Sequence, residues 1–377
     1  MNILQISFHT APMNSLGVND GGGLNVYVES ISKELAKDNI VHIITGEQAK
    51  NMSKKNLKLS SFNLFTNQAN TEEKKEFLDE FIEKTFQYIE EHEIDVVHAH
   101  YWLSGLVAKE IKQRYKIPFI FTSHSLGVFI QENGLDRISA EKEIFNSADK
   151  ITASSQFEKE NLLNRYGADK LKIHIVTPGL NEKTFKAFRG EKRKNIILSV
   201  GRIQKQKGQL QTLDLFKNLQ YRIKGLELIF VGGPSGADGE AYLTKMKNKI
   251  EELRIEEDVQ FVGSLSQKKL VKLMRKSKLL IHSAESETFG LVAIEAHRSG
   301  LPVLSTNQGS FKEIISNNED GLVSKSFEDV QVYDFIIKLF ENEEYRSQLI
   351  NNAVKNSLVF NWEITAQNLK KAYKNII

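Results

Sequence analysis

The sequence contains no cysteine among its 377 residues. This absence excludes a disulfide framework, a zinc–thiolate site, an iron–sulfur cluster and a cysteine nucleophile, and it suits a reducing compartment, so we expect a cytoplasmic protein. No apolar run approaches the ~20 residues that a membrane-spanning helix needs. The first residues, Met1–Ile6, lack the charged region and cleavage site of a signal peptide. A peripheral contact with a membrane stays open.

An excess of charge of one sign is also missing. The chain has 51 Lys and Arg against 48 Asp and Glu, a net charge of +3. That balance argues against a nucleic-acid binder, whose affinity depends on neutralising many phosphates, but it leaves room for a small cationic pocket. A hydrophobic fraction of 40% with 26% charged residues indicates a globular chain. The length predicts two domains.

Short β-branched runs alternate with segments of helical period along nearly the whole chain. This order predicts an α/β fold of two Rossmann-like domains, each a parallel sheet flanked by helices, with the ligand in the cleft between them. A polar, basic stretch between Pro178 and Asn195 predicts the hinge. The expected strands are Ile3–Ser7, Val41–Thr45, Ile94–Ala99, Phe119–Ser123, Lys150–Ala153, His174–Thr177, Ile196–Val200, Leu228–Val231, Val259–Val262, Leu279–His282 and Pro302–Ser305.

Two short motifs could bind an anion. Asp20-Gly21-Gly22-Gly23 opens a predicted helix, where the backbone can approach a ligand and free N–H groups face it. Val26 interrupts any G-x-G-x-x-G pattern, which counts against a nicotinamide-dependent dehydrogenase. Arg202 follows the strand Ile196–Val200, and Lys207 lies at a helix start, so two cations could meet phosphate there. The alternative for the glycine motif is a flexible loop before a helix. The alternative for Arg202 and Lys207 is that they are two exposed basic residues in a loop.

The most specific motif runs from Glu287 to Ala296 and has two glutamates separated by seven residues. A helix that begins near Gly290 would carry Glu295 about one turn in, with Glu287 in the preceding loop. Carboxylates so placed can accept hydrogen bonds from the vicinal hydroxyls of a sugar or ribose. A pair of surface glutamates is the alternative, but it leaves the apolar Phe-Gly-Leu-Val context unexplained.

A metal site is considered and not expected. His98 and His100 point to one face of a strand, and His124 follows the next strand, but no third ligand stands at metal spacing. The chain also has no Asp-x-Asp pair and no Walker loop. A bound diphosphate would therefore be met by Arg202, Lys207 and helix ends, and no cofactor is required.

Together these residues resemble a retaining glycosyltransferase of family 4, with the GT-B architecture of two facing Rossmann-like domains. The Glu-x7-Glu segment and the Gly-Arg…Lys-Gly segment are the features most typical of that family. Similarity to D-inositol 3-phosphate glycosyltransferases comes from the segments His9–Pro12, Asp20–Val28 and His100–Gly105. Sucrose-phosphate synthases share the segment His124–Gly127.

The resemblance implies a role for each matching residue. Donor diphosphate binding falls on Gly23, Arg202 and Lys207, and Glu295 would hold the ribose. Glu287 would contact the transferred sugar, and His124 would lie beside it at the reaction centre. The backbone of Phe289, Gly290, Leu291 and Val292 would help hold the donor. For the acceptor, the resemblance suggests His9, Asn25, Tyr101, Ser125 and Arg137, with Arg137 as a phosphate anchor. The residues implied in catalysis are His124, Glu287, Arg202 and Lys207.

Three positions depart from the family pattern. Ser125 stands where Thr is usual, and Leu78 occupies the position of a basic residue, with Lys74 and Lys75 only nearby. Leu301 stands where a metal-ligating Thr would be expected. The acceptor half of the assignment therefore depends on fewer matches than the donor half.

The expected activity is transfer of a hexose or N-acetylhexosamine from a nucleotide sugar, which the resemblance implies to be UDP-linked, to a small phosphorylated acceptor such as inositol phosphate or a sugar phosphate. Residues 1–185 would bind the acceptor and residues 195–355 the nucleotide sugar, and the helix in residues 356–377 would pack back toward the first domain. A transferase of glycolipid or polysaccharide synthesis, a nucleotide-sugar epimerase and a non-catalytic binder are the alternatives. Both a monomer and a homodimer stay open.

Overall fold

The computed structural model describes residues 1–13, 22–129, 134–187, 192–236 and 238–377. Within these, the chain divides into two compact units. The N-terminal unit holds residues 1–13, 22–179 and 362–377, and the C-terminal unit holds the described residues between 180 and 361. The chain therefore enters the first unit, leaves it for the second, and returns with its last helix.

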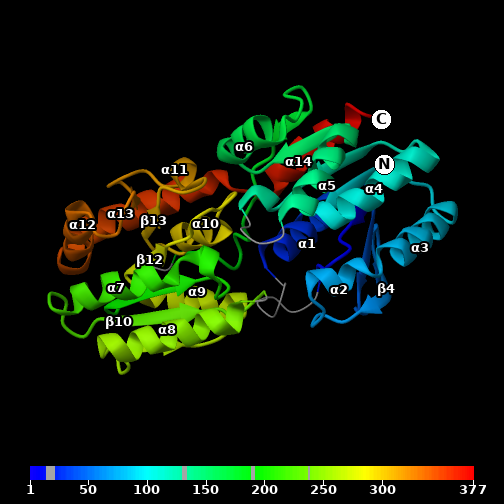
Figure 1. Cartoon of the computed structure of the whole chain (residues 1–377). Helices are drawn as coiled ribbons and strands as arrows, with labels where there is room; N and C mark the ends of the chain where they lie inside the picture. Colours follow the sequence, from blue (N-terminus) through cyan, green and yellow to red (C-terminus); the bar gives the residue numbers. More distant parts are fainter. Residues whose placement is uncertain (14–21, 130–133, 188–191, 237) are drawn as a thin grey trace. The chain divides into compact units, whose positions relative to one another are not determined.

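The N-terminal unit is built on an eight-stranded sheet in the order β3-β4-β2-β1-β5-β6-β7-β8, parallel except for the antiparallel pair β3–β4. Its last helix, α14, lies beside α1 (Figure 1). Its elements are β1 (Asn2–Ile6), α1 (Gly23–Leu35), β2 (Ile40–Glu47), β3 (Met52–Lys54), β4 (Leu57–Phe65), α2 (Thr71–Lys75), α3 (Leu78–Glu90), β5 (Val96–His100), α4 (Trp102–Tyr115), β6 (Phe119–Thr122), α5 (Gly134–Ser147), β7 (Lys150–Ala153), α6 (Gln156–Tyr166), β8 (Ile173–Ile175) and α14 (Trp362–Lys374).

The C-terminal unit is built on a six-stranded parallel sheet in the order β11-β10-β9-β12-β13-β14. Its elements are β9 (Ile196–Val200), α7 (Gln209–Gln220), β10 (Glu227–Val231), α8 (Gly239–Leu253), β11 (Val259–Phe261), α9 (Gln267–Lys276), β12 (Leu279–His282), α10 (Leu291–Arg298), β13 (Val303–Thr306), α11 (Phe311–Ile314), β14 (Gly321–Ser324), α12 (Val330–Glu341) and α13 (Glu343–Asn356). Short 3₁₀ turns at Gly127–Phe129, Lys205–Lys207 and Ser357–Val359 complete the described elements.

Each sheet is covered on both faces, because successive side chains of a strand point to opposite sides. In β1, Leu4 and Ile6 join one apolar cluster, whereas Ile3 joins the cluster beneath α1 and α14. The second sheet is divided in the same way: Ile197 packs on one side and Leu198 on the other. Strands buried on both faces read as near-continuous apolar runs, which is why the sequence located them.

All the strands expected from the sequence are present, to within a few residues at each end. Three further strands, β3, β4 and β14, were not expected. β4 alternates buried and partly exposed residues near the edge of its sheet, so no apolar run marks it. β14 is short and starts at Gly321, where an added Cβ would lie 2.3 Å from the Val303 carbonyl oxygen. Only a glycine permits this close approach of the two strands.

The segment expected to form a helix from residue 356 begins that helix later, at Trp362. Helix α13 continues to Asn356, and a 3₁₀ turn and a bridge between Leu180 and Asn361 fill the interval. The returning helix buries Trp362, Leu369 and Tyr373 against the N-terminal sheet cluster.

Both sheets reverse their strand order once, at β1/β5 in the N-terminal unit and at β9/β12 in the C-terminal unit. In open α/β sheets, ligands bind outside the carboxyl ends of the strands at such a reversal point. The residues that follow β1, β5, β6, β9 and β12 are therefore the first place to look for a site in each unit.

Candidate active site

In the C-terminal unit, the loop after β12 is held against the turn after β9. Gly208, with a φ of 63°, ends the 3₁₀ turn, and a Cβ there would lie 2.1 Å from the Ser283 carbonyl oxygen. Ser283 Oγ donates to the Lys207 carbonyl at 2.9 Å. These contacts bring Lys207 Nζ to 2.7 Å from Glu287 Oε2, so two predicted residues 80 positions apart form an ion pair.

The Glu287 loop is fixed from its other side by Gly309 and Ser310. A Cβ on Gly309 would lie 2.4 Å from the Glu287 carbonyl oxygen, and the φ of Gly309 is 99°. The backbone N–H of Ser310 donates to that carbonyl at 3.1 Å, and Ser310 Oγ donates to the Phe289 carbonyl at 2.7 Å. The position of Glu287 thus depends on a glycine that the sequence motif does not include.

The predicted helix begins at Leu291, with Gly290 as its N-cap at a φ of 87°. No side chain caps this end of α10, so N–H groups of its first turn lack an intrahelical acceptor and can bind an anion. Arg202 is exposed just after β9, and its carbonyl accepts a hydrogen bond from Gln209 Nε2 at 2.8 Å. Basic groups and a helix N-terminus therefore follow the two strands at the reversal point of this sheet.

The two glutamates of the motif have opposite electrostatic environments. Burial by itself would raise the pKa of Glu287, but Lys207, His282 and Arg202 outweigh burial and lower that pKa. Burial raises the pKa of Glu295 to about 8, with no opposing charge. Glu287 is consequently a carboxylate at neutral pH, whereas Glu295 is mostly protonated in the unliganded protein.

His282, the last residue of β12, belongs to this group although it was not predicted. Its Nε2 lies 3.7 Å from Glu287 Oε2, and burial, aided by Lys207, lowers its pKa to about 4. Its place at the carboxyl end of a strand beside the reversal point is the signal in the sequence that marks it, whereas the Glu-x7-Glu segment marks only the loop and helix that follow.

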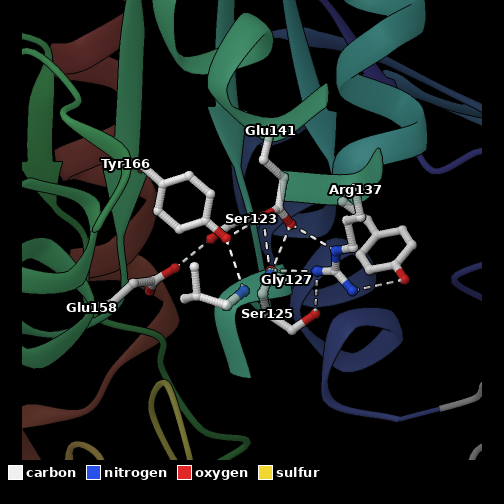
Figure 2. A network of polar contacts seen from close by, with 9 residues as sticks. Ser123, Ser125, Gly127, Arg137, Glu141, Glu158 and Tyr166 are labelled. Atoms are coloured by element: carbon white, nitrogen blue, oxygen red, sulfur yellow. Dashed lines mark hydrogen bonds and ion pairs between the residues drawn. The ribbon is translucent and has the colours of Figure 1, made fainter. Parts of the chain in front are cut away.

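In the N-terminal unit, three predicted acceptor residues lie together, and Figure 2 shows two of them, Ser125 and Arg137. Arg137 Nη1 donates to the Tyr101 hydroxyl at 3.2 Å, and Arg137 Nη2 donates to the Ser125 carbonyl at 2.7 Å and to Ser125 Oγ at 3.0 Å. The His9 ring lies 4.2 Å from the Tyr101 ring, centroid to centroid. These side chains come from β1, β5 and β6 ends and from α5.

Arg137 also forms a buried ion pair that the sequence analysis did not foresee. Its Nε donates to Glu141 Oε1 at 2.7 Å, and Glu141 also accepts from the Gly127 N–H and the Tyr166 hydroxyl (Figure 2). The Glu141 side chain is 0% exposed. The i, i+4 spacing of Arg137 and Glu141, which lie on α5, was a signal that could have identified the pair.

The remaining predicted residues fall as follows. Asn25 is buried on α1 and donates from Nδ2 to the Ala11 carbonyl at 3.3 Å, and Gly23 is the exposed first residue of α1. Asp20 and Gly21, from the same predicted motif, lie outside the described residues. Lys74 is buried with its Nζ 5.7 Å from the Phe65 ring centroid, and Lys75 pairs with Glu72 at 2.8 Å. Leu301 is part of the apolar core.

His98 and His100, the pair weighed as zinc ligands, form hydrogen bonds with protein groups. His98 hydrogen-bonds Tyr373 and Thr122, and His100 hydrogen-bonds Gln5 and His124 Nε2. In the part of the chain that the structure describes, no cluster of three or more His, Asp or Glu could hold a metal ion. Across those same residues, no helix combines the length and apolar character needed to cross a membrane.

The structure shows two doubly wound sheets with charged and polar side chains after their central strands, and the class of protein follows from comparison with known families. A model described as Glycosyltransferase Family 4 matches residues 21–184, and one described as Glycosyl transferases group 1 matches residues 181–356. The D-inositol 3-phosphate glycosyltransferase of Nocardia farcinica is 30% identical, covering 98% of this chain and 88% of its own. The chain belongs to glycosyltransferase family 4.

Solved structures agree on the fold. Sucrose-phosphate synthase from Thermosynechococcus elongatus superposes with a TM-score of 0.88 at 24% identity, covering 99% of this chain and 98% of its own. An Anabaena protein in complex with UDP and glucose gives a TM-score of 0.79 at 17% identity, with both chains fully covered. The predicted family, the GT-B fold and the class of enzyme are therefore confirmed, whereas the individual site residues stay predictions.

Proposed function

We propose that this glycosyltransferase moves a hexose or N-acetylhexosamine from a UDP-sugar to a hydroxyl of a small phosphorylated acceptor, inositol phosphate or a sugar phosphate, with retention of anomeric configuration. The names of the relatives, D-inositol 3-phosphate glycosyltransferase and sucrose-phosphate synthase, support the acceptor class. The UDP and glucose in the Anabaena structure support the donor class.

The observation that carries the proposal is the ion pair between Lys207 and Glu287 beside the uncapped start of α10. The Lys207 ammonium group has three N–H donors, and its bond to Glu287 uses one of them. Lys207 can therefore also donate to a phosphate oxygen. Arg202 and the first N–H groups of α10 supply further positive charge. Glu287, kept ionised by its neighbours, can accept hydrogen bonds from sugar hydroxyls.

We assign the ribose to Glu295, which burial keeps mostly protonated at neutral pH. A carboxylate at this position accepts from two vicinal hydroxyls, which a protonated carboxyl group does less well. Binding of the nucleotide would therefore favour loss of the proton from Glu295. This linkage makes nucleotide affinity depend on pH in a defined direction.

The acceptor half rests on Arg137. Four of its five N–H groups already donate to Glu141, Tyr101 and Ser125, and Glu141 neutralises its charge. Attraction to a phosphate would then come from directed hydrogen bonds, from the remaining Nη1 N–H and from the hydroxyls of Tyr101 and Ser125, more than from net charge. Such a site favours a small anion in one orientation.

In the proposed transfer step, the acceptor hydroxyl attacks the sugar directly, and no side chain of the enzyme acts as a nucleophile. The acceptor oxygen forms a bond to the anomeric carbon on the face from which the diphosphate leaves, the bond between that carbon and the phosphate oxygen breaks, and the acceptor proton passes to the departing oxygen. Arg202, Lys207 and the α10 N-terminus stabilise the charge that grows on the diphosphate. Removing one such preorganised donor costs about 10²–10³ in rate in enzymes of known mechanism.

The test is release of UDP from UDP-glucose and UDP-GlcNAc, each offered with inositol phosphate, fructose 6-phosphate and glucose 6-phosphate, with and without a chelator. Release that depends on one phosphorylated acceptor and survives the chelator supports the proposal and its independence from a divalent metal. If only lipid or glycan acceptors stimulate release, the phosphorylated acceptor is wrong. Conversion of the UDP-sugar without any acceptor would point to an epimerase.

A further inference from the structure

One face of the N-terminal sheet carries a row of polar side chains in an otherwise apolar layer. The strand residues that share this face come from neighbouring strands and pair across the sheet: Gln5 opposite His98, His100 opposite Thr122, and Thr122 opposite Thr152. None is more than 6% exposed. Burying a polar group costs free energy unless each of its donors and acceptors forms a hydrogen bond. A row of such groups in place of apolar side chains therefore suggests a role beyond packing.

The first half of the row leads to His124, at the end of β6. His124 Nε2 lies 2.9 Å from His100 Nδ1, and His100 Nε2 lies 2.5 Å from Gln5 Oε1. His124 has a φ of 57°, a left-handed conformation that is unfavourable for a residue with a Cβ. The contact with His100 is one of the interactions that hold it there.

The second half passes through the returning helix. Gln5 Nε2 donates to the hydroxyl of Tyr373 on α14 at 3.4 Å, and that hydroxyl lies 2.7 Å from His98 Nδ1. His98 Nε2 lies 2.7 Å from Thr122 Oγ1, which hydrogen-bonds Thr152 Oγ1. Thr152 Oγ1 in turn donates to the Phe121 carbonyl at 3.5 Å.

Two groups set the direction of the bonds in this chain: the Gln5 amide, whose Oε1 faces His100 and whose Nε2 faces Tyr373, and the Phe121 carbonyl, which only accepts. Thr152 donates to Phe121, so it accepts from Thr122, and Thr122 accepts from His98 Nε2. His98 Nδ1 then accepts from the Tyr373 hydroxyl.

Tyr373, having used its proton, accepts from Gln5 Nε2. Gln5 Oε1 faces His100 and accepts from His100 Nε2, and His100 Nδ1 accepts from His124 Nε2. Burial lowers the pKa of His98 and of His124 to about 3 and lowers the pKa of His100 well below its ordinary value, so each ring is neutral and carries a single N–H. Burial raises the pKa of Tyr373, which keeps its proton.

We propose that Tyr373, Gln5 and His100 are positioning residues that fix the tautomer of His124, so that His124 carries its proton on Nε2 and presents Nδ1 as a hydrogen-bond acceptor. The inference rests on the proposed function, in which His124 lies beside the transferred sugar, because an acceptor nitrogen selects a sugar hydroxyl, which can donate to it. The C-terminal helix thereby contributes to the reaction without touching substrate.

The test is the ring-nitrogen NMR spectrum of the full-length protein with ¹⁵N-labelled histidine, each ring assigned through its single His→Gln substitution. In the wild type we expect the Nε2–H tautomer for His98, His100 and His124. Tyr373→Phe and Gln5→Met each interrupt the chain, and we expect a mixture of tautomers at His124 and about a ten-fold lower kcat, the effect of losing one oriented hydrogen bond. The dissociation constant for UDP should change by less than about two-fold, since the nucleotide is assigned to the C-terminal unit.

Tyr88→Phe is the matched control. The Tyr88 hydroxyl lies 2.8 Å from His42 Nδ1, the same kind of buried tyrosine–histidine bond in the same unit, but outside the chain that leads to His124. It should lower thermal stability about as much as Tyr373→Phe and leave the His124 tautomer and kcat unchanged. The inference is overturned if His124 carries its proton on Nδ1 in the wild type, or if both Tyr373→Phe and Gln5→Met leave its tautomer intact. If the tautomers are as expected but no glycosyl transfer occurs, the proposed function fails and the positioning chain stands.

Discussion

Lys207 Nζ lies 2.7 Å from Glu287 Oε2, so the cation assigned to the leaving diphosphate and the carboxylate assigned to the sugar form one ion pair. The pair lowers the pKa of Glu287 against the effect of its burial. Among the neighbouring charges, Lys207 contributes most to this lowering, so removing Lys207 should let burial raise the pKa of Glu287.

Glu287→Ala should lower kcat about 10²-fold, because an interaction with the reacting sugar is lost, while UDP binding changes little. Steady-state kinetics and calorimetric titration with UDP separate the two effects. Glu285→Ala, in the same loop but exposed, is the control and should behave as the wild type. Normal turnover of Glu287→Ala would remove Glu287 from the site.

Gly309→Ala should reduce kcat at least about ten-fold by displacing the Glu287 loop, since its Cβ would overlap the Glu287 carbonyl oxygen at 2.4 Å. A non-glycine residue at its φ of 99° is also strained. Gly225→Ala is a matched control, because Gly225 has a φ of 66° and nothing within 4 Å of an added Cβ. Both variants should lose stability in urea unfolding, but only Gly309→Ala should lose activity. Equal activity of the two would show that the loop tolerates the shift.

Arg137→Ala should raise the KM for a phosphorylated acceptor about 10- to 100-fold, the range for hydrogen bonds to a charged group. The KM for the UDP-sugar should stay near the wild-type value. Arg165→Ala, an exposed arginine on α6, serves as the control. An unchanged acceptor KM in Arg137→Ala would argue against a phosphate at that position.

Glu141→Ala should destabilise the protein by about 3–5 kcal/mol, because it leaves the buried Arg137 guanidinium without its counter-charge. Urea unfolding of the N-terminal unit measures this. Glu143→Ala, on the same helix, removes an exposed ion pair with Lys109 and should have little effect. If the two variants were equally stable, water or another group would have to compensate Arg137.

UDP binding should strengthen as the pH rises from 7.5 to 9, by up to about four-fold, because a group with a pKa of about 8 goes from mostly protonated to mostly ionised over this range. Burial raises the pKa of Glu295 to about 8, so the unliganded protein holds a proton that the ribose hydroxyls displace. At a higher pH, Glu295 has already lost that proton, so UDP binding no longer includes the cost of removing it. Isothermal titration with UDP checks this, and Glu295→Gln, which cannot ionise, should lose this part of the pH dependence. The same slope in both proteins would place the titrating group elsewhere.

Much of the fold could be predicted because its strands are buried on both faces. Their apolar runs and the helical spacing between them are local properties of the chain, and so are the Glu-x7-Glu segment and the Gly-Arg…Lys-Gly segment. β4 escaped prediction because it lies near a sheet edge, where partial exposure removes the apolar run. β14 escaped because it is short and starts at a glycine required by its neighbour Val303.

Relations between residues far apart in the sequence could not be predicted, because they depend on the folded chain. Gly309 restrains Glu287, and no local pattern shows that role. Local signals exist for Glu141 and His282, but the burial of the Arg137–Glu141 pair and the approach of His282 to Glu287 depend on the assembled sheets. The clearest case is Tyr373, which meets Gln5 across 368 positions because the chain returns to the first sheet with its last helix. Most of the elements and the chemical groups at their ends could be predicted from the amino-acid sequence, since burial pattern and residue type are local properties. The partners of those groups depended on which strands became neighbours, and that is set only when the whole sheet assembles.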